Sequence, residues 1–299
     1  MNWMELSILA GSNEVAPIDA IMSNYGHGGT VIEEVPPATG RRRFLIKAYL
    51  LQNRSYRAQR LQIEQDLSKT GQLTSTLMER KLEPDEWLTS LKSHFSTAEI
   101  GDWLVVKPSW SEKEIPASGR TVIELDPGAA FGTGLHPTTR LCLQGLKENL
   151  APGMSVLDLG TGSGIISIAA EKLGAADILA LDIDPVAVRA AKNNIACNCA
   201  SNAIQVRRGT LSQRALTRYK NYFDLVIANI TARAISDLAE AFFKVLKPGG
   251  KLIVSGIHDE GLDEVLISLA LADFGLEKVE DENGWHAVVA NKSKIKIRQ

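Results

Sequence analysis

A short apolar strand that runs directly into a glycine-rich turn and a helix is the feature that most constrains this chain. The strand is expected over Val156 to Leu159, and the turn carries Gly160, Gly162 and Gly164 before a helix expected over Ile165 to Leu173. Glycines let a backbone approach a ligand closely, and the first turn of a helix presents unpaired N–H groups and a partial positive charge. We therefore predict that these glycines bind a ligand.

The residues around this turn indicate the kind of ligand. A dinucleotide-binding G-x-G-x-x-G turn would need glycine where this chain has Ile165, and Asp158 just before the turn suits a ligand with an amino group. Asp182 ends the next expected strand, where a carboxylate can accept hydrogen bonds from both hydroxyls of a ribose. Asp184 precedes Pro185 and is expected to cap the following helix. The pattern favours a nucleoside over a pyrophosphate.

From Val156 onward, short apolar strands alternate with helical patterns. Such alternation predicts an α/β fold with a mostly parallel sheet covered on both faces, in which the last two strands form an antiparallel pair. The seven strands are expected over Val156 to Leu159, Ile178 to Asp182, Ile204 to Arg207, Leu225 to Ala228, Leu252 to Ser255, Leu276 to Val279 and Trp285 to Ala290.

Asn229 follows one of these strands, at the sheet edge where parallel sheets place functional groups. Its amide can both donate and accept hydrogen bonds, so it is a candidate ligand-binding residue. The alternative is that Asn229 caps the helix expected after Thr231.

The loop from Asp126 to Thr139 leads into an amphipathic helix expected over Arg140 to Leu150. Thr138 and Thr139 place hydroxyls near the helix start, where they can meet a ligand or cap the helix. His136 is either a catalytic base or, as we favour, a loop histidine whose hydrogen bonds are made within the protein.

The first 80 residues show a different pattern of secondary structure, with short strands and helices expected in the order β-α-β-β-α-β. That order predicts a small ferredoxin-like α+β domain. Its elements are expected over Trp3 to Leu9, Ala16 to Asn24, Thr30 to Val35, Phe44 to Leu51, Tyr56 to Leu67 and Thr74 to Glu83.

Composition and charge exclude several classes of protein. The net charge of −2 argues against a nucleic-acid coat or a membrane-surface binder. Nowhere do about 18 apolar residues follow one another, and no secretion signal opens the chain, so we expect a cytoplasmic protein. Cys142, Cys197 and Cys199 show no Cys-x-x-Cys spacing, which favours reduced thiols and no metal site.

The chain also resembles a known family. Leu157 to Gly164, the acid Asp182 and the strand end Ala228 to Ile230 resemble the class I S-adenosylmethionine-dependent methyltransferases. The loop from Asp126 to Thr139, with the residues that follow it, is very similar to the signature of the bacterial family that methylates ribosomal protein L11 of the large subunit. The resemblance spans nearly the whole chain.

This resemblance implies a Rossmann-like methyltransferase domain over residues 97–299, a linker over 81–96 and a substrate-recognition domain over 1–80. It implies S-adenosyl-L-methionine as cofactor, with S-adenosyl-L-homocysteine as product, and a ribosomal large-subunit protein as partner. By resemblance, Thr139, Gly160, Asp182 and Asn229 occupy cofactor-binding positions, and Asn229 also lies beside the amine that accepts the methyl group.

Two regions depart from the family's pattern. The linker carries Trp87 and Phe95 but has Leu91 where a second tryptophan is expected, and the first 80 residues diverge as well. These departures affect the expected identity of the protein substrate more than the expectation that the chain transfers methyl groups.

Other functions remain as alternatives: methyl transfer to another protein lysine or to a small molecule, or cofactor binding without turnover. Methylation of a nucleic-acid base is less favoured because Asn229 is followed by Ile230 and Thr231 rather than by Pro-Pro and an aromatic residue. The basic run from Arg41 to Arg60 is at least as well explained by a solvated face as by RNA contact, so no stable nucleic-acid binding is expected.

Overall fold

The computed structural model describes residues 3–23, 25–26, 30–36, 42–53, 55–69, 76–82, 97–111, 115, 119–126, 134, 136–200 and 202–293. The chain divides into two compact units, Met1–Ser96 and Thr97–Gln299. Each unit has its own buried hydrophobic residues.

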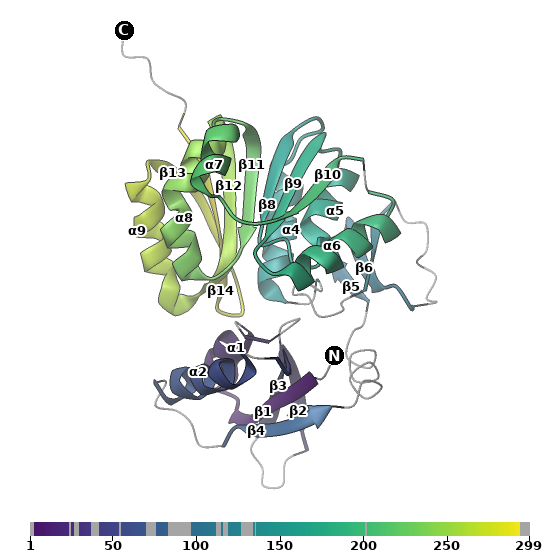
Figure 1. Cartoon of the computed structure of the whole chain (residues 1–299), viewed down its shortest axis with the longest axis vertical. Helices are drawn as coiled ribbons and strands as arrows, with labels where there is room; N and C mark the ends of the chain where they lie inside the picture. The colour runs from purple at the N-terminus through teal and green to yellow at the C-terminus, as the bar shows by residue number, and fades with distance from the viewer. Residues whose placement is uncertain are drawn as a thin grey trace. The chain divides into compact units, whose positions relative to one another are not determined.

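The first unit is a four-stranded antiparallel sheet in the order β2-β3-β1-β4, with α1 and α2 on one side (Figure 1). This is the ferredoxin-like arrangement that the sequence predicts. The last strand is shorter than expected, and its predicted ends Thr74 and Glu83 lie outside the described residues. The elements are β1 (Trp3–Gly11), α1 (Val15–Ser23), β2 (Thr30–Val35), β3 (Arg43–Leu51), α2 (Tyr56–Lys69) and β4 (Met78–Leu82).

The second unit is built on a seven-stranded sheet in the order β10-β9-β8-β11-β12-β14-β13. The first five strands of that order pair in parallel, and β14 pairs antiparallel with both β12 and β13, as predicted. The strands are β8 (Ser155–Leu159), β9 (Asp177–Asp182), β10 (Ile204–Arg208), β11 (Phe223–Asn229), β12 (Leu246–His258), β13 (Phe274–Glu282) and β14 (Trp285–Lys292).

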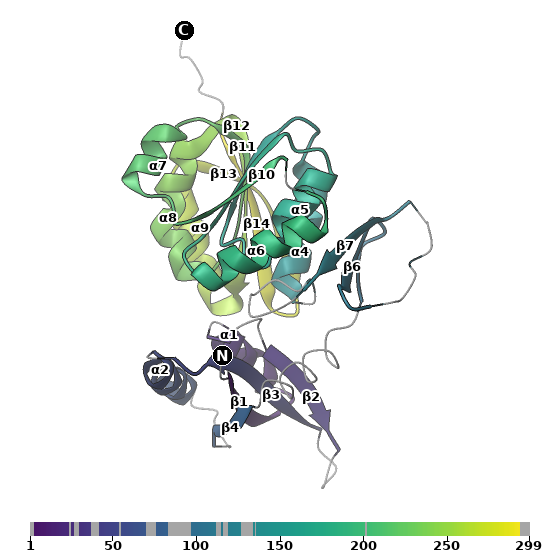
Figure 2. The same ribbon diagram turned by 45° about the vertical axis from the view of Figure 1, so that its right-hand side comes forward.

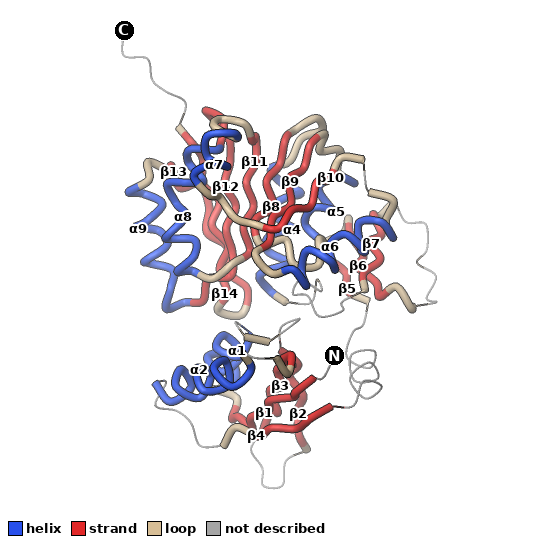
Figure 3. The backbone as a smooth tube through the Cα atoms, in the orientation of Figure 1, coloured by secondary structure: helices blue, strands red, loops and turns tan. Residues whose placement is uncertain are grey.

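Helices cover both faces of this sheet (Figure 3). Along β11, Leu225 and Ile227 pack into the hydrophobic cluster on one face, whereas Val226 and Ala228 pack into the cluster on the other. Two buried faces explain why the strands read as nearly continuous apolar runs. One face carries α4 (Pro137–Asn149), α5 (Ile165–Lys172) and α6 (Pro185–Cys197), and the other carries α7 (Gln213–Arg218), α8 (Ala232–Val245) and α9 (Leu262–Leu271).

A separate three-stranded sheet precedes α4 and was not predicted (Figure 2). It consists of β5 (Ala98–Ile100), β6 (Leu104–Pro108) and β7 (Thr121–Leu125). Leu104, Ile123 and Leu125 are buried in the same cluster as α4 and α5. The strands are too short for their periodicity to stand out in the sequence, and their stability comes from this packing.

Among the described residues, no helix is long and apolar enough to cross a membrane.

Candidate functional site

The glycine-rich turn joins β8 to α5 and has a left-handed backbone at each of the predicted glycines. The φ angles are +77° at Gly160, +55° at Gly162 and +86° at Gly164. The N–H groups of Gly160 and Thr161 donate to the carbonyl oxygen of Leu181 on β9, at 2.8 and 3.0 Å. Glycine adopts this conformation without the strain that a Cβ atom usually adds, so the three glycines favour this path of the turn.

The turn lies directly against the end of β11. A Cβ atom added at Gly160 would lie 2.4 Å from Cγ2 of Ile230 and 3.5 Å from the carbonyl oxygen of Asn229. From the other side, a Cβ atom at Gly256 would lie 2.1 Å from the carbonyl oxygen of Ile230. The two glycines therefore enclose the strand end that carries Asn229.

Asp182 is half-buried at the end of β9, where two backbone N–H groups fix its carboxylate. Oδ2 accepts a hydrogen bond from Gly162 at 3.0 Å, and Oδ1 accepts one from Asp184 at 2.9 Å. Burial raises the pKa of Asp182 above its ordinary value. Asp184 itself caps α6 by accepting from the N–H of Val186 at 2.8 Å, as predicted. Each oxygen of Asp182 retains capacity to accept a further hydrogen bond.

Asp158 lies beneath the turn and is fully buried. Its Oδ2 accepts hydrogen bonds from the hydroxyls of Thr161, at 2.7 Å, and Ser167, at 2.6 Å. Burial raises its pKa to about 6. Its Oδ1 is also buried and has no hydrogen-bond partner within the described part of the chain. Asp158 thus ties the turn to the first helical residues of α5.

Thr139 and Asn229, which are far apart in the sequence, are brought together. The Nδ2 of Asn229 donates to Oγ1 of Thr139 at 3.4 Å, near the upper limit for a hydrogen bond. Thr139 is fully buried in the first turn of α4, and Asn229 is half-buried at the end of β11. Because Nδ2 faces Thr139, Oδ1 is the end of the amide that can accept from a ligand. Asn229 does not cap α8, since Thr231 does so by accepting from Ala234.

The helix α4 begins three residues earlier than predicted, at Pro137. Its cap is His136 rather than Thr138, because Nδ1 of His136 accepts from the N–H of Thr138. Burial, with a contribution from Arg140, lowers the pKa of His136 to about 4, so the ring is neutral near pH 7. Residues 127–133 and 135 of the preceding loop lie outside the described residues.

Two asparagines that sequence reasoning missed, Asn194 in α6 and Asn198 at its C-cap, hold β7 against the turn. Asn198 exchanges two hydrogen bonds with the backbone of Glu124, at 3.0 and 2.6 Å. Asn194 accepts from the N–H of Asp126 at 2.9 Å and donates to the carbonyl oxygen of Ser163 at 2.8 Å. Their four-residue spacing places both on one helix face, which is the only sequence signal of this role. They fix the start of the loop that leads to Thr139.

The cysteines lie apart from these residues. Cys142 is buried in α4, whereas Cys197 and Cys199 are exposed at the end of α6, and all three are free thiols.

The fold and the site together define a class. A mostly parallel seven-stranded sheet, a glycine-rich turn after one central strand and an acid at the end of its neighbour make the second unit a class I S-adenosylmethionine-dependent methyltransferase. A family model described as "Ribosomal protein L11 methyltransferase (PrmA)" matches residues 2–293, and the chain belongs to this family.

Individual relatives agree with this assignment. The ribosomal protein L11 methyltransferase of Listeria innocua is 35% identical over 98% of this chain and 99% of its own length. That of Geobacillus kaustophilus is also 35% identical, over 98% of this chain and all of its own length. The crystal structure of a ribosomal protein L11 methylase from Lactobacillus delbrueckii subsp. bulgaricus has a TM-score of 0.61 and 32% identity, and covers 67% of this chain and all of that one.

Proposed function

We propose that this chain transfers methyl groups from S-adenosylmethionine to amines of ribosomal protein L11, at lysine side chains, the N-terminal α-amine, or both. The names of the curated relatives, whose alignments cover 98% of this chain, support the substrate. The structural observation that carries the proposal is that Thr139 holds the side-chain amide of Asn229, at a strand end that packs against the glycine-rich turn.

The residues of the turn fit the cofactor. Asp182 is fixed by two N–H groups and retains acceptor capacity for the hydroxyls of a ribose. Gly160 and Gly162 keep the left-handed backbone of the turn free of side chains, so the backbone itself can approach the cofactor closely. Asp158 and Gly164 support this backbone, because Asp158 binds Thr161 and Gly164 begins α5. The Oδ1 of Asp158, which has no hydrogen-bond partner among the residues that the structure describes, also suits an amino group close to the turn.

The protein has to hold a neutral amine in line with the methyl group. The cofactor supplies a methyl group already activated by its sulfonium, so orientation of the amine, which can contribute about 7–11 kcal/mol, is the main task of the site. The Oδ1 of Asn229 accepts an N–H of the amine and turns the lone pair toward the methyl group. Thr139 keeps that amide from rotating.

The amine must lose a proton before it reacts. An α-amine with a pKa of about 7.7–8.0 loses it readily, whereas lysine, at about 10.4, needs a desolvated site that disfavours its charged form. His136 is not suited to take this proton near pH 7, because its pKa is about 4. We infer that the proton leaves to water before the amine binds, and that Asn229 orients the neutral amine.

We further propose that the first unit recognises the protein substrate, with residues 1–80 as the recognition domain, 81–96 as the linker and 97–299 as the methyltransferase domain. The described functional residues all lie in the second unit, so the first is free for binding. A form that begins near Glu83 should bind S-adenosylmethionine as the whole chain does, yet methylate L11 poorly. Full activity of that form on L11 would contradict the recognition role.

We also propose that the protein is cytoplasmic, as expected for a protein that modifies a ribosomal protein, and that it makes no stable complex with nucleic acid. Ion pairs made by basic residues of the first unit support the second point. Arg42 pairs with Glu34 at 3.6 Å, and Lys47 pairs with Glu33 at 2.7 Å. Arg60 contacts Glu64 and Glu79 at 2.9 and 2.8 Å. Carboxylates neutralise these cations, which leaves less positive charge for phosphates.

The test is incubation of the protein with radiolabelled S-adenosylmethionine and an extract of hypomethylated ribosomes. The proposal expects label on L11. Label on another protein would show that the chain methylates proteins but that L11 is not the substrate. If the cofactor binds but no protein is labelled, a small-molecule acceptor is favoured.

A further inference from the structure

The tip of the β13–β14 hairpin, residues 281–286, has a well-defined local structure. Asn283 and Gly284 have φ angles of +56° and +77°, the pattern of a tight two-residue hairpin turn. The N–H of Gly284 donates to Oδ2 of Asp281 at 3.1 Å, and its carbonyl oxygen accepts from the N–H of Asp259 at 3.2 Å. The hairpin tip is therefore tied to the segment that follows β12.

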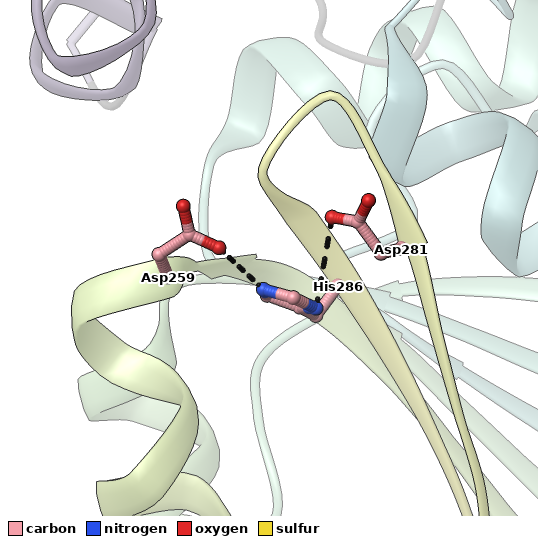
Figure 4. A group of neighbouring side chains, drawn as sticks. All are labelled: Asp259, Asp281 and His286. Carbon is pink, nitrogen blue, oxygen red and sulfur yellow. Dashed lines mark hydrogen bonds and ion pairs between the residues drawn. The ribbon is translucent and has the colours of Figure 1, made fainter.

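His286 reinforces this tie, because its ring lies between two carboxylates (Figure 4). Its Nε2 lies 2.7 Å from Oδ1 of Asp259, and its Nδ1 lies 3.9 Å from Oδ2 of Asp281. The two carboxylates lie at different nitrogens of the ring, whereas a metal ion would need them around a single nitrogen. The group is thus suited to join two segments of chain rather than to bind a cation.

The hairpin tip also contacts the first turn of α4. Trp285 is buried, and its ring meets that of His136, the cap of α4, edge-on with centroids 4.9 Å apart. Glu282 binds the guanidinium of Arg140, with Nε and Oε2 at 3.2 Å. The same helical turn carries Thr139, which accepts the hydrogen bond from Asn229.

A second path leads from the tip to Asn229 through β12. The hydroxyl of Ser255 donates to the carbonyl oxygen of His286 at 2.8 Å. The carbonyl oxygen of Ser255 accepts from the N–H of Ile230 at 3.1 Å, next to Asn229 in the chain. The residues on both sides of the Thr139–Asn229 hydrogen bond are therefore connected to the hairpin tip.

We propose that the hairpin tip braces the first turn of α4, and that His286 is a positioning residue for methyl transfer. By holding the tip to Asp259, His286 keeps Trp285 and Glu282 against α4, and so keeps Thr139 within reach of Asn229. This inference rests on the proposed roles of Thr139 and Asn229. Reaction geometry is sensitive to displacements of about 1 Å, so loosening the brace should affect turnover even though His286 does not touch the substrate.

Hydrogen exchange tests the brace without any substrate. In His286→Ala, the amides of residues 138–143 should exchange faster than in the wild type, because the tip no longer holds α4. Glu277→Ala is the matched control: Glu277 lies on the same hairpin but far from its tip, and it contacts Lys251 of β12 and Asn291 of β14. Equal exchange of α4 in all three proteins would overturn the brace.

Kinetics test the positioning role. His286→Ala should lower kcat on the order of tenfold and should weaken the calorimetric Kd for S-adenosylmethionine less than that, since the contacts described above lead from the tip to α4 and β12 rather than to Gly160, Gly162 or Gly164. His286→Gln keeps a side-chain N–H for Asp259 and should recover most of kcat. Asp259→Ala should match His286→Ala, and the double variant should lose no more than either one.

A kcat equal to that of the wild type in folded His286→Ala would overturn the inference, as would a loss that His286→Gln does not recover. These results are distinct from failure of the proposed function. If the wild type methylates no protein, the proposed function fails, and the hydrogen exchange of α4 alone decides whether the brace exists.

Discussion

Replacing Gly160 with alanine would place a methyl group in space that the end of β11 already occupies. The left-handed φ of +77° costs an alanine about 1–2 kcal/mol. The added Cβ would also lie 2.4 Å from Cγ2 of Ile230, and relieving such overpacking costs about 1–3 kcal/mol. The two effects together should lower the free energy of unfolding of the second unit by about 2–5 kcal/mol. Domains are stable by about 5–15 kcal/mol, so the variant should still fold.

Two further variants separate these effects. Gly153 has a similar φ of +86°, but no atom lies within 4 Å of a Cβ added there, so Gly153→Ala should show the backbone cost alone. Ile230→Ala removes the atom that would clash. The double variant Gly160→Ala/Ile230→Ala should therefore lose about 1–3 kcal/mol less free energy of unfolding than the sum of the two single variants.

Because the chain has two units, stability is best measured from hydrogen exchange of the β8 and β11 amides, which reports on the second unit alone. Calorimetry should also show weaker S-adenosylmethionine binding in Gly160→Ala but not in Gly153→Ala. Two results together would show that the turn does not pack against β11 as described. Gly160→Ala and Gly153→Ala would lose equal free energy of unfolding, and adding Ile230→Ala to either one would give the sum of the single losses.

Three other substitutions test individual side chains. Asp182→Ala should weaken S-adenosylmethionine binding by about 1.5–3 kcal/mol, the scale of a hydrogen bond to a charged group, and an unchanged calorimetric Kd would refute its role. Asn229→Ala should lower kcat more than it weakens cofactor binding, and equal losses would make Asn229 a cofactor ligand or a structural residue. Burial raises the pKa of Asp158 to about 6, so the folded state holds this proton more tightly than the unfolded chain does. Asp158 should therefore contribute a loss of folding free energy on the order of 3 kcal/mol as pH rises from about 4 to above 6. Asp158→Asn should lack that loss in urea unfolding, and identical pH profiles of the two proteins would contradict the argument.

The parallel sheet could be predicted because each strand is an apolar run bounded by turn residues. The sheet β5–β7 could not, because its strands have three to five residues and depend on contacts with α4 and α5. The helix α4 was predicted to begin at Arg140 because Thr138 and Thr139 resemble caps, yet a histidine followed by Pro137 caps it. A ring nitrogen can accept the same hydrogen bond as a hydroxyl, which propensity alone does not reveal.

For the candidate site, local sequence signals were enough to propose the turn, Asp182 and Asn229, because glycines and strand ends occupy positions that can be recognised in the sequence. The contact of Asn229 with Thr139 depends on tertiary structure, although each residue was a candidate by itself. Asn194, Asn198 and Gly256 were missed, because an asparagine on a helix or a glycine in a strand has many uses. Only the packing around them reveals their roles.

The most direct test of methyl transfer at this site is the mass of purified L11 after incubation with the protein and S-adenosylmethionine. The wild type and Glu277→Ala should add one or more methyl groups, which fragmentation should locate on lysines or the N-terminal amine. Asn229→Ala, at equal cofactor saturation, should add them far more slowly. Unmodified L11 after incubation with the wild type, or modification by Asn229→Ala at the wild-type rate, would contradict the account.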